Sequence, residues 1–499
     1  MSRELLLVGF FLWGANVLAQ QELVPMTFDQ ALQTALSNNE TLQQAVLQKR
    51  QAESERKAVR TLRFPQLSLN AYYLMLSDDV TIDMHGVKDA ITPLYGAMAQ
   101  YGVFSGVPNP DPATSGVMPV LPDDISTQVV RQQLADGLLK VENGEWDKLI
   151  QKSQFGTVSA GVTWPLFTGG KINAANEVAK IRISEAAQVE RQKTGELMSQ
   201  LVERYFGLAL ALEAEQVRRE VLSAMEAHLS DAEKLFEEGM LAKAELLHAQ
   251  VYHAQADREY KKSIRESRVI NEALANSMAE SPEVRYQPLT SLFYNESIES
   301  VDFFKLQAQT SNPLLQQVGA KQELAKQAVR AERSGLLPTV AAFGTYNLAN
   351  VDLSPNVSDY MAGITLSWKI FGGTSARHKY QSARFVEERV DQAWTKAARD
   401  LSTGIEKYHQ EIQMILEQLQ ELASAEAFAD EYYRVRKQAF NEGMATSTEV
   451  TDASLAVAKV RIEKLQAMYQ YDVALSRLLE LAGMPEYFPN YLRSPMYWN

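Results

Sequence analysis

Few residues of this sequence have the types and spacing that catalysis or metal binding requires. The 499 residues contain no cysteine, which excludes disulfides, thiolate metal ligands and cysteine nucleophiles. One of the six histidines, His85, has Asp83 and Asp89 nearby, but we do not interpret this group as a metal site. We find neither a nucleotide-binding loop nor a catalytic constellation, and a net charge of −13 without a basic stripe argues against nucleic-acid binding. The sequence therefore predicts a protein that is not an enzyme and uses no cofactor.

The first residues have the pattern of an export signal. Arg3 precedes an apolar run at residues 5–13, and Val-Leu-Ala at 17–19 fits the small-residue rule for signal peptidase. We expect residues 1–19 to be a signal peptide, with a buried N-terminal helix as the alternative. No other segment is apolar enough to span a bilayer as a helix, and no cysteine is available for lipid attachment. The mature chain is thus expected in the periplasm, outside the cell or in the outer membrane.

An internal duplication organises the rest of the chain. Two pairs of segments match at a shift of 273 residues (312 minus 39): NETLQQ at 39–44 with NPLLQQ at 312–317, and FPQL at 64–67 with LPTV at 337–340. Two later pairs match at a shift of 204 (368 minus 164): WPLF at 164–167 with WKIF at 368–371, and EGM at 238–240 with EGM at 442–444. Two constant shifts predict two copies that differ by one insertion.

The difference between the shifts, 273 minus 204, is 69 additional residues in the first copy. We place them at about 77–151, a segment with six of the 17 prolines. The first repeat is then expected at 20–290 and the second at 291–484, followed by a C-terminal tail at 485–499.

Each copy is expected to begin with a helix that a proline ends, Pro65 in the first copy and Pro338 in the second. Strands with alternating apolar and polar residues follow. Such strands fit a membrane β-barrel, although an ordinary half-buried hairpin alternates in the same way. Four aromatic residues are expected near the membrane interfaces: Tyr72, Tyr73, Trp164 and Trp368.

Long proline-free stretches come after the strands. Apolar residues recur at helical spacing through them, and a helix from Lys171 to Glu238 would be roughly 100 Å long. Each stretch contains one Phe-x-x-Gly motif, Phe236 to Gly239 and Phe440 to Gly443. A glycine that closes a helix before a new amphipathic run is typical of a helical hairpin. We therefore expect hairpin tips at about 236–245 and 440–449.

The strands also predict an oligomer. Two copies of two strands give four, too few to close a membrane barrel, and an open sheet edge is not tolerated in lipid. Three chains would supply twelve strands, a sensible closed barrel. A homotrimer is the simplest solution, although counting also allows two or four subunits.

These features together resemble the TolC family of outer-membrane efflux and secretion channels, from about Thr27 to Met484. The resemblance rests on the duplication, the string GVTWPLFTGGK at 161–171 and the two Phe-x-x-Gly tips. It implies a mainly helical trimer with a twelve-stranded β-barrel in the outer membrane and a long α-helical barrel in the periplasm. It also implies that the tips dock onto a periplasmic adaptor protein, which links the channel to an inner-membrane pump.

The resemblance further implies an acidic ring at the periplasmic aperture, formed by Glu449 and Asp452. Three copies of each carboxylate would favour cations, and their repulsion would raise their pKa values. The alternative is that both are ordinary acids of a first helical turn. Glu245 and His248 occupy the matching places in the first copy. His248 would then sense pH near the ring or, alternatively, be a solvated helix residue.

Family gates often use polar partners such as tyrosine and arginine, but the aromatic residues at both tips here are phenylalanines, which favours apolar packing instead. The insertion is expected to face outward as a cap, a receptor surface or a plug, with a partly disordered surface loop as the alternative. The leading hypothesis is a passive exit duct of a tripartite efflux or type I secretion system. The alternative is a periplasmic coiled-coil adaptor, which usually has a single helical hairpin.

Overall fold

The computed structural model describes residues 23–493. The expected signal peptide at 1–19 and the last six residues of the chain lie outside this range. The chain is mainly helical, with long helices and small sheets, and forms two compact units. One unit is helical and contains residues up to Arg60, Gly170–Gly335 and the chain from Gly372 onward. The other contains the main strands and the insertion, at Thr61–Gly169 and Leu336–Phe371.

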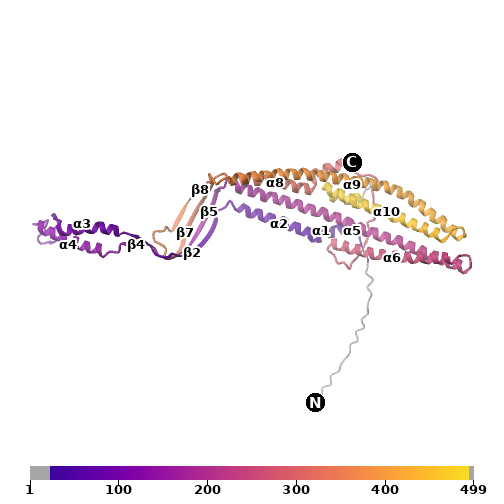
Figure 1. The fold of residues 1–499 in the computed structure, drawn as a ribbon, viewed down its shortest axis with the longest axis horizontal. Coiled ribbons are helices and arrows are strands. Elements are labelled where there is room, and N and C mark those ends of the chain that lie inside the picture. The colour runs from indigo at the N-terminus through magenta and orange to yellow at the C-terminus, as the bar shows by residue number, and fades with distance from the viewer. Residues whose placement is uncertain (1–22, 494–499) are drawn as a thin grey trace, which may run out of the picture. The chain divides into compact units, whose positions relative to one another are not determined.

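The helical unit repeats one set of elements twice, with nearly equal lengths. The first set is α1 (Phe28–Asn38), α2 (Glu40–Thr61), α5 (Lys171–Glu237) and α6 (Lys243–Ser277). The second set is α7 (Val301–Ser311), α8 (Pro313–Ser334), α9 (Ser375–Asn441) and α10 (Ser447–Ala482). Both α5 and α9 have 67 residues, about 100 Å at 1.5 Å per residue. Each packs along the shorter helix that follows it (Figure 1).

Aromatic side chains from distant parts of the chain form the core of the helical unit. Phe28, Phe206 and Phe488 lie within 6.0 Å of one another, measured between ring centroids. The Tyr205 hydroxyl donates to the Met26 carbonyl at 2.7 Å and accepts from the Thr290 backbone N–H at 3.0 Å. Phe488 comes from α11 (Phe488–Arg493), which follows a short 3₁₀ helix at Pro485–Tyr487. The tail after the second repeat thus contributes to the core.

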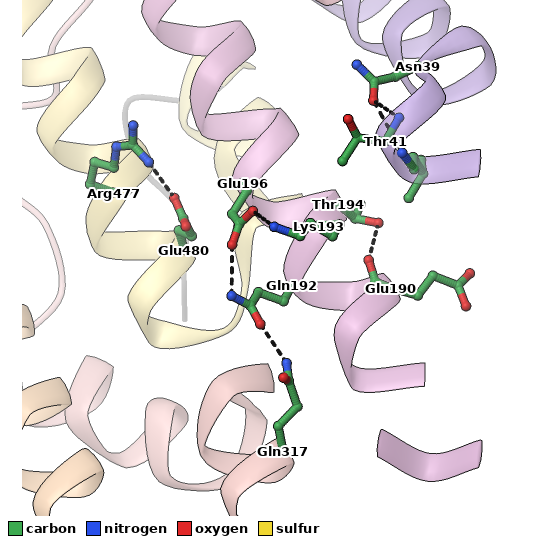
Figure 2. A network of polar contacts seen from close by, with 11 residues as sticks. Asn39, Thr41, Glu190, Gln192, Lys193, Thr194, Glu196, Gln317, Arg477 and Glu480 are labelled. Atoms are coloured by element: carbon green, nitrogen blue, oxygen red, sulfur yellow. Dashed lines mark hydrogen bonds and ion pairs between the residues drawn. The ribbon is translucent and has the colours of Figure 1, made fainter. Parts of the chain in front are cut away.

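A pair of short strands joins the two ends of the first copy, and polar contacts join the first copy to the second. β1 (Leu23–Met26) pairs in parallel with β6 (Arg285–Pro288). Figure 2 shows the side chain of Gln317 in α8 donating to Gln192 in α5 at 2.6 Å, and Gln192 donating in turn to Glu196 at 2.8 Å. These bonds give the α5–α8 contact a defined register in addition to its apolar packing.

The second unit holds a four-stranded antiparallel sheet in the order β2-β5-β7-β8. The strands are β2 (Gln66–Met75), β5 (Gln154–Phe167), β7 (Thr339–Val351) and β8 (Tyr360–Ser367). The two central strands, β5 and β7, come from different copies of the repeat. The two hairpins therefore merge into one sheet whose outer strands, β2 and β8, each have a free edge within residues 23–493.

The insertion is a folded substructure. β3 (Val80–Asp83) and β4 (Asp147–Gln151) form an antiparallel pair, and α3 (His85–Tyr101) packs on α4 (Asp123–Glu142) between them (Figure 1). Helices and strands thus cover more than half of this segment, while 102–122 has neither. Among residues 23–493, no helix is both long and apolar enough to cross a membrane.

Candidate functional site at the helical tips

Glycines end both long helices in the same way. Gly239 and Gly443 have φ values of 78° and 73°, a left-handed conformation that costs other L-residues about 1–2 kcal/mol. The N–H of the residue after each glycine then turns back into the helix. Met240 donates to the Leu235 carbonyl and Met444 to the Ala439 carbonyl, each at 2.8 Å. This is the six-residue closing bond of a Schellman motif.

The two tip phenylalanines have different environments. Phe440 is 4% exposed, and its ring lies 4.7 Å from the ring of His228 in α5. Phe236, the matching residue of the first copy, is 38% exposed. Phe440 thus packs between the two hairpins, as expected for apolar packing at the tips, whereas Phe236 is available to another molecule.

Ser447, the first residue of α10, connects the hairpins through polar contacts. Its hydroxyl is 2.6 Å from Nε2 of His228, and its backbone N–H donates to a Glu245 carboxylate oxygen at 3.2 Å. Glu245 therefore interacts with the positive end of the α10 helix dipole. His228, Ser447 and Glu245 thus add polar contacts between the hairpins to the apolar packing of Phe440.

His248 also faces the second hairpin. Its Nε2 is 3.4 Å from the Thr448 hydroxyl, and its ring lies 4.5 Å from that of Tyr252. Its Nδ1 is buried without a hydrogen-bond partner in the described part of the chain. His248 is thus partly buried in the single chain, and its pH-sensing role stays a prediction.

Glu449 is held by its own helix. It forms a capping box with Thr446, whose backbone N–H donates to the carboxylate at 2.8 Å, and Arg436 of α9 pairs with the other oxygen at 3.1 Å. The bond from the Thr446 N–H is the main cause of a lowered pKa of Glu449, and the Arg436 charge adds to it. The expected rise in pKa depends on repulsion between three copies, which a single chain does not contain, so it stays a prediction.

Asp452 differs from the other three expected ring residues. It is exposed, and no ion pair neutralises it within residues 23–493. Of the four, it alone presents a carboxylate without a bonding partner.

Sequence reasoning missed two residues of this site, His228 and Arg436. His228 is 6% exposed, and burial is the main cause of its lowered pKa. Both lie inside regular amphipathic helices, where no local motif distinguishes them. Only the packing of α5 and α9 against α10 shows that they belong to the tips.

The four expected girdle aromatics lie in the strand unit. The Trp164 indole donates to the Arg63 carbonyl at 3.0 Å, and the Trp368 indole donates to the Leu336 carbonyl at 3.2 Å. The first bond joins β5 to the segment just before β2, and the second joins the residue after β8 to the segment just before β7. Tyr72 and Tyr73 are neighbours in β2, so their side chains point to opposite faces of the sheet. Only one of the two tyrosines can therefore share a face with lipid.

The helical tips and the sheet also occur in known proteins. Residues 147–279 and 306–484 match the family model of the outer membrane efflux proteins, more than half of the chain. The chain belongs to the outer membrane efflux protein family. Each matched range contains one hairpin tip, whereas residues up to 146, which include most of the insertion, lie outside both.

Individual relatives agree with this assignment. Outer membrane protein TolC of Vibrio cholerae is 26% identical over 181 residues, which are 36% of this chain and 40% of that protein. The match thus spans less than half of that relative. A membrane protein from Pseudomonas aeruginosa shares the fold, with a TM-score of 0.70, 13% identity and coverage of 93% of this chain and 91% of that one. So does the Campylobacter jejuni CmeC outer membrane channel, with a TM-score of 0.67, 13% identity and coverage of 92% and 86%.

Membership of the outer membrane efflux protein family confirms two expectations. The TolC-type resemblance is confirmed, and so is assignment to a family of transport channels rather than enzymes. The family is also one of outer-membrane proteins, in agreement with the expected location.

Proposed function

We propose that three copies of this chain form a passive duct, with a twelve-stranded barrel in the outer membrane and a helical barrel in the periplasm. The observation that carries the proposal is the four-stranded sheet, which exposes both apolar side chains and free edges. Leu67 is 77% exposed and Ile364 71% exposed in the single chain. A soluble sheet would cover such residues, whereas a barrel wall presents them to lipid.

The free edges of β2 and β8 support closure by other copies. Each edge offers unpaired N–H and C=O groups, and each such group costs several kcal/mol in hydrocarbon. Pairing β8 of one chain with β2 of the next satisfies both edges. Three chains give twelve strands, while two give eight and leave little lumen.

The height of the sheet also suits a membrane. Trp164 pairs with Ala342 near one end of β5, and Gly156 pairs with Tyr73 near the other end. The eight residue steps from 156 to 164 span about 26 Å along the strand at 3.3 Å per residue, which is about 20 Å along the membrane normal at a tilt of about 40°. That length approaches the apolar band of about 25 Å in outer-membrane barrels, which has aromatic girdles at both interfaces.

The duct is proposed to serve a tripartite efflux or type I secretion system, with a periplasmic adaptor and an inner-membrane pump as partners. The tips support docking because Phe236, Met240 and Met444 are exposed apolar side chains beside Gly239 and Gly443. Flexible methionines suit contacts with another helical hairpin. The aperture ring is proposed at Asp452, with Glu449 behind it.

Two experiments test the duct. Membrane fractionation followed by electrophoresis with and without heating should recover the chain from the outer membrane as a heat-resistant oligomer of three subunits. Cysteines introduced at one β2 position and one β8 position should crosslink only between subunits. A soluble monomer in the periplasmic fraction would instead favour the adaptor alternative, which the two hairpins and the exposed sheet disfavour.

A further inference from the structure

The base of the insertion brings together three side chains that are separated in the sequence. The register of the β3–β4 pair sets Asp83 directly opposite Asp147. His85 follows two residues after Asp83, at the start of α3. One imidazole nitrogen and two carboxylate oxygens thus lie within 4.8 Å of one another. The second acid beside His85 is thus Asp147 rather than the Asp89 that the sequence suggested.

The charges at this place are unbalanced. Like charges directly opposite in an antiparallel pair destabilise it. In the part of the chain that the structure describes, no lysine or arginine forms an ion pair with Asp83 or Asp147, and His85 alone contacts both. Lys88 instead donates to the Glu142 carbonyl at 2.9 Å. Two carboxylates beside one imidazole therefore leave a net negative charge that a bound cation would neutralise.

The distances suit a metal ion. Nδ1 of His85 is 2.8 Å from Oδ1 of Asp83 and 3.6 Å from Oδ1 of Asp147. Neighbouring ligands of a tetrahedral zinc ion lie about 3.3 Å apart, given metal–ligand bonds of about 2.0–2.2 Å. The two distances from His85 therefore bracket the separation that a bound zinc ion requires. The exposure of all three side chains lets water fill the remaining position.

The backbone around the three residues is held in place. Met84 donates its N–H to the Trp146 carbonyl at 2.9 Å, which continues the β3–β4 ladder toward the helices. The Trp146 indole donates to the Val141 carbonyl at 2.7 Å, at the end of α4. The three ligands therefore stand on a ladder and a helix start, so little ordering is needed when an ion binds.

We propose that Asp83, His85 and Asp147 bind one divalent transition-metal ion, with Zn²⁺ preferred over Mg²⁺ and Ca²⁺. An imidazole ligand suits zinc, whereas magnesium and calcium select oxygen ligands only. The ion would join β3 to β4 at the point where the α3–α4 hairpin leaves the strands. Bound metal therefore stabilises the fold of the insertion. The site is independent of the duct, since it involves neither the tips nor the sheet edges.

Isothermal titration of the metal-stripped, detergent-purified full chain with ZnCl₂ tests this proposal. We expect one zinc ion per chain at this site, at least tenfold weaker binding in His85→Ala and Asp147→Asn, and little competition from equimolar Mg²⁺. Asp89→Asn is the matched control, because it removes the same charge from the first turns of α3 without removing a ligand. Its affinity should stay within twofold of the unchanged chain.

Limited proteolysis supplies a second measurement. Zinc should slow cleavage within 84–146 in the unchanged chain and in Asp89→Asn, but not in Asp147→Asn. The proposal is overturned if zinc does not bind stoichiometrically, if Asp147→Asn binds it as before, or if Asp89→Asn weakens binding equally. The last result would indicate diffuse attraction to an acidic surface.

Discussion

His228 and Ser447 form a hydrogen bond of 2.6 Å between Nε2 and Oγ, which links α5 of the first hairpin to the first residue of α10 in the second. The bond is buried and lies beside Phe440, so the two hairpin tips are held together at one point by polar and apolar contacts. This contact should respond to pH.

We expect acid to weaken the contact between the hairpins. Burial lowers the pKa of His228, with His248 and Lys437 acting in the same direction and Asp231 and Glu245 opposing them. A histidine whose pKa is lower in the folded state than in the unfolded state stabilises the fold above about pH 6.5, and this stabilisation is lost as the pH falls.

Thermal unfolding between pH 7.5 and pH 5 measures the effect. The difference in Tm between the unchanged chain and His228→Gln should shrink as the pH falls, because glutamine keeps a polar group but does not titrate. Parallel pH curves for the two proteins would assign the pH dependence to other groups.

Removing the charge of Asp472 should stabilise the protein at neutral pH. Asp472 is 0% exposed, and neither of its carboxylate oxygens has a well-formed hydrogen bond in the described part of the chain. Burial raises its pKa well above the ordinary value, and the nearby Phe293 backbone N–H opposes this only in part. A raised pKa in the folded state means that the fold gains stability from Asp472 only at low pH and loses it as the pH rises.

Asp472→Asn should therefore unfold at a higher temperature than the unchanged chain at pH 7. The advantage should vanish near pH 4, where both side chains are neutral. A lower Tm at pH 7 would mean that the carboxylate makes a favourable contact in the assembled protein.

Two glycines with similar backbone angles should differ in their tolerance of alanine. Gly443 has a φ of 73° and open space where a Cβ would lie, so Gly443→Ala should cost only the conformational strain of about 1–2 kcal/mol. Gly483 has a φ of 76°, but a Cβ there would lie 2.5 Å from the Ser311 carbonyl carbon. Gly483→Ala should therefore be clearly more destabilising in thermal unfolding, and equal losses would contradict this reasoning.

Asp452 should dominate cation binding at the proposed aperture. Glu449 is already paired with Arg436 and Thr446, whereas Asp452 is exposed. In single-channel recordings, Asp452→Asn should weaken block by multivalent cations about as much as alanine at both positions. Glu449→Gln is the control and should have a smaller effect. Unchanged block in the double variant would remove both residues from the constriction.

Much of the architecture follows from local patterns. The long proline-free stretches with helical apolar spacing predicted α5 and α9, because few other structures tolerate that spacing over so many residues. Gly239 and Gly443 predicted the hairpin ends, since a left-handed residue is needed there. The strands were predictable from alternation, but their order was not. The central β5–β7 pairing joins residues of different copies, and no local pattern encodes it.

The sequence by itself determined that this chain is duplicated, mainly helical and related to outer-membrane channels, since periodicity, turn residues and motif spacing are properties of neighbouring residues. Only the tertiary structure decided how matching residues diverge in role. Phe440 is buried against His228 while Phe236 is exposed, and His248 contacts Thr448 while its counterpart Asp452 makes no ion pair within residues 23–493. Asp147 lies beside His85 because a strand register brings together residues 62 positions apart (147 minus 85). Contacts of this kind depend on packing between distant segments, which sequence spacing does not specify.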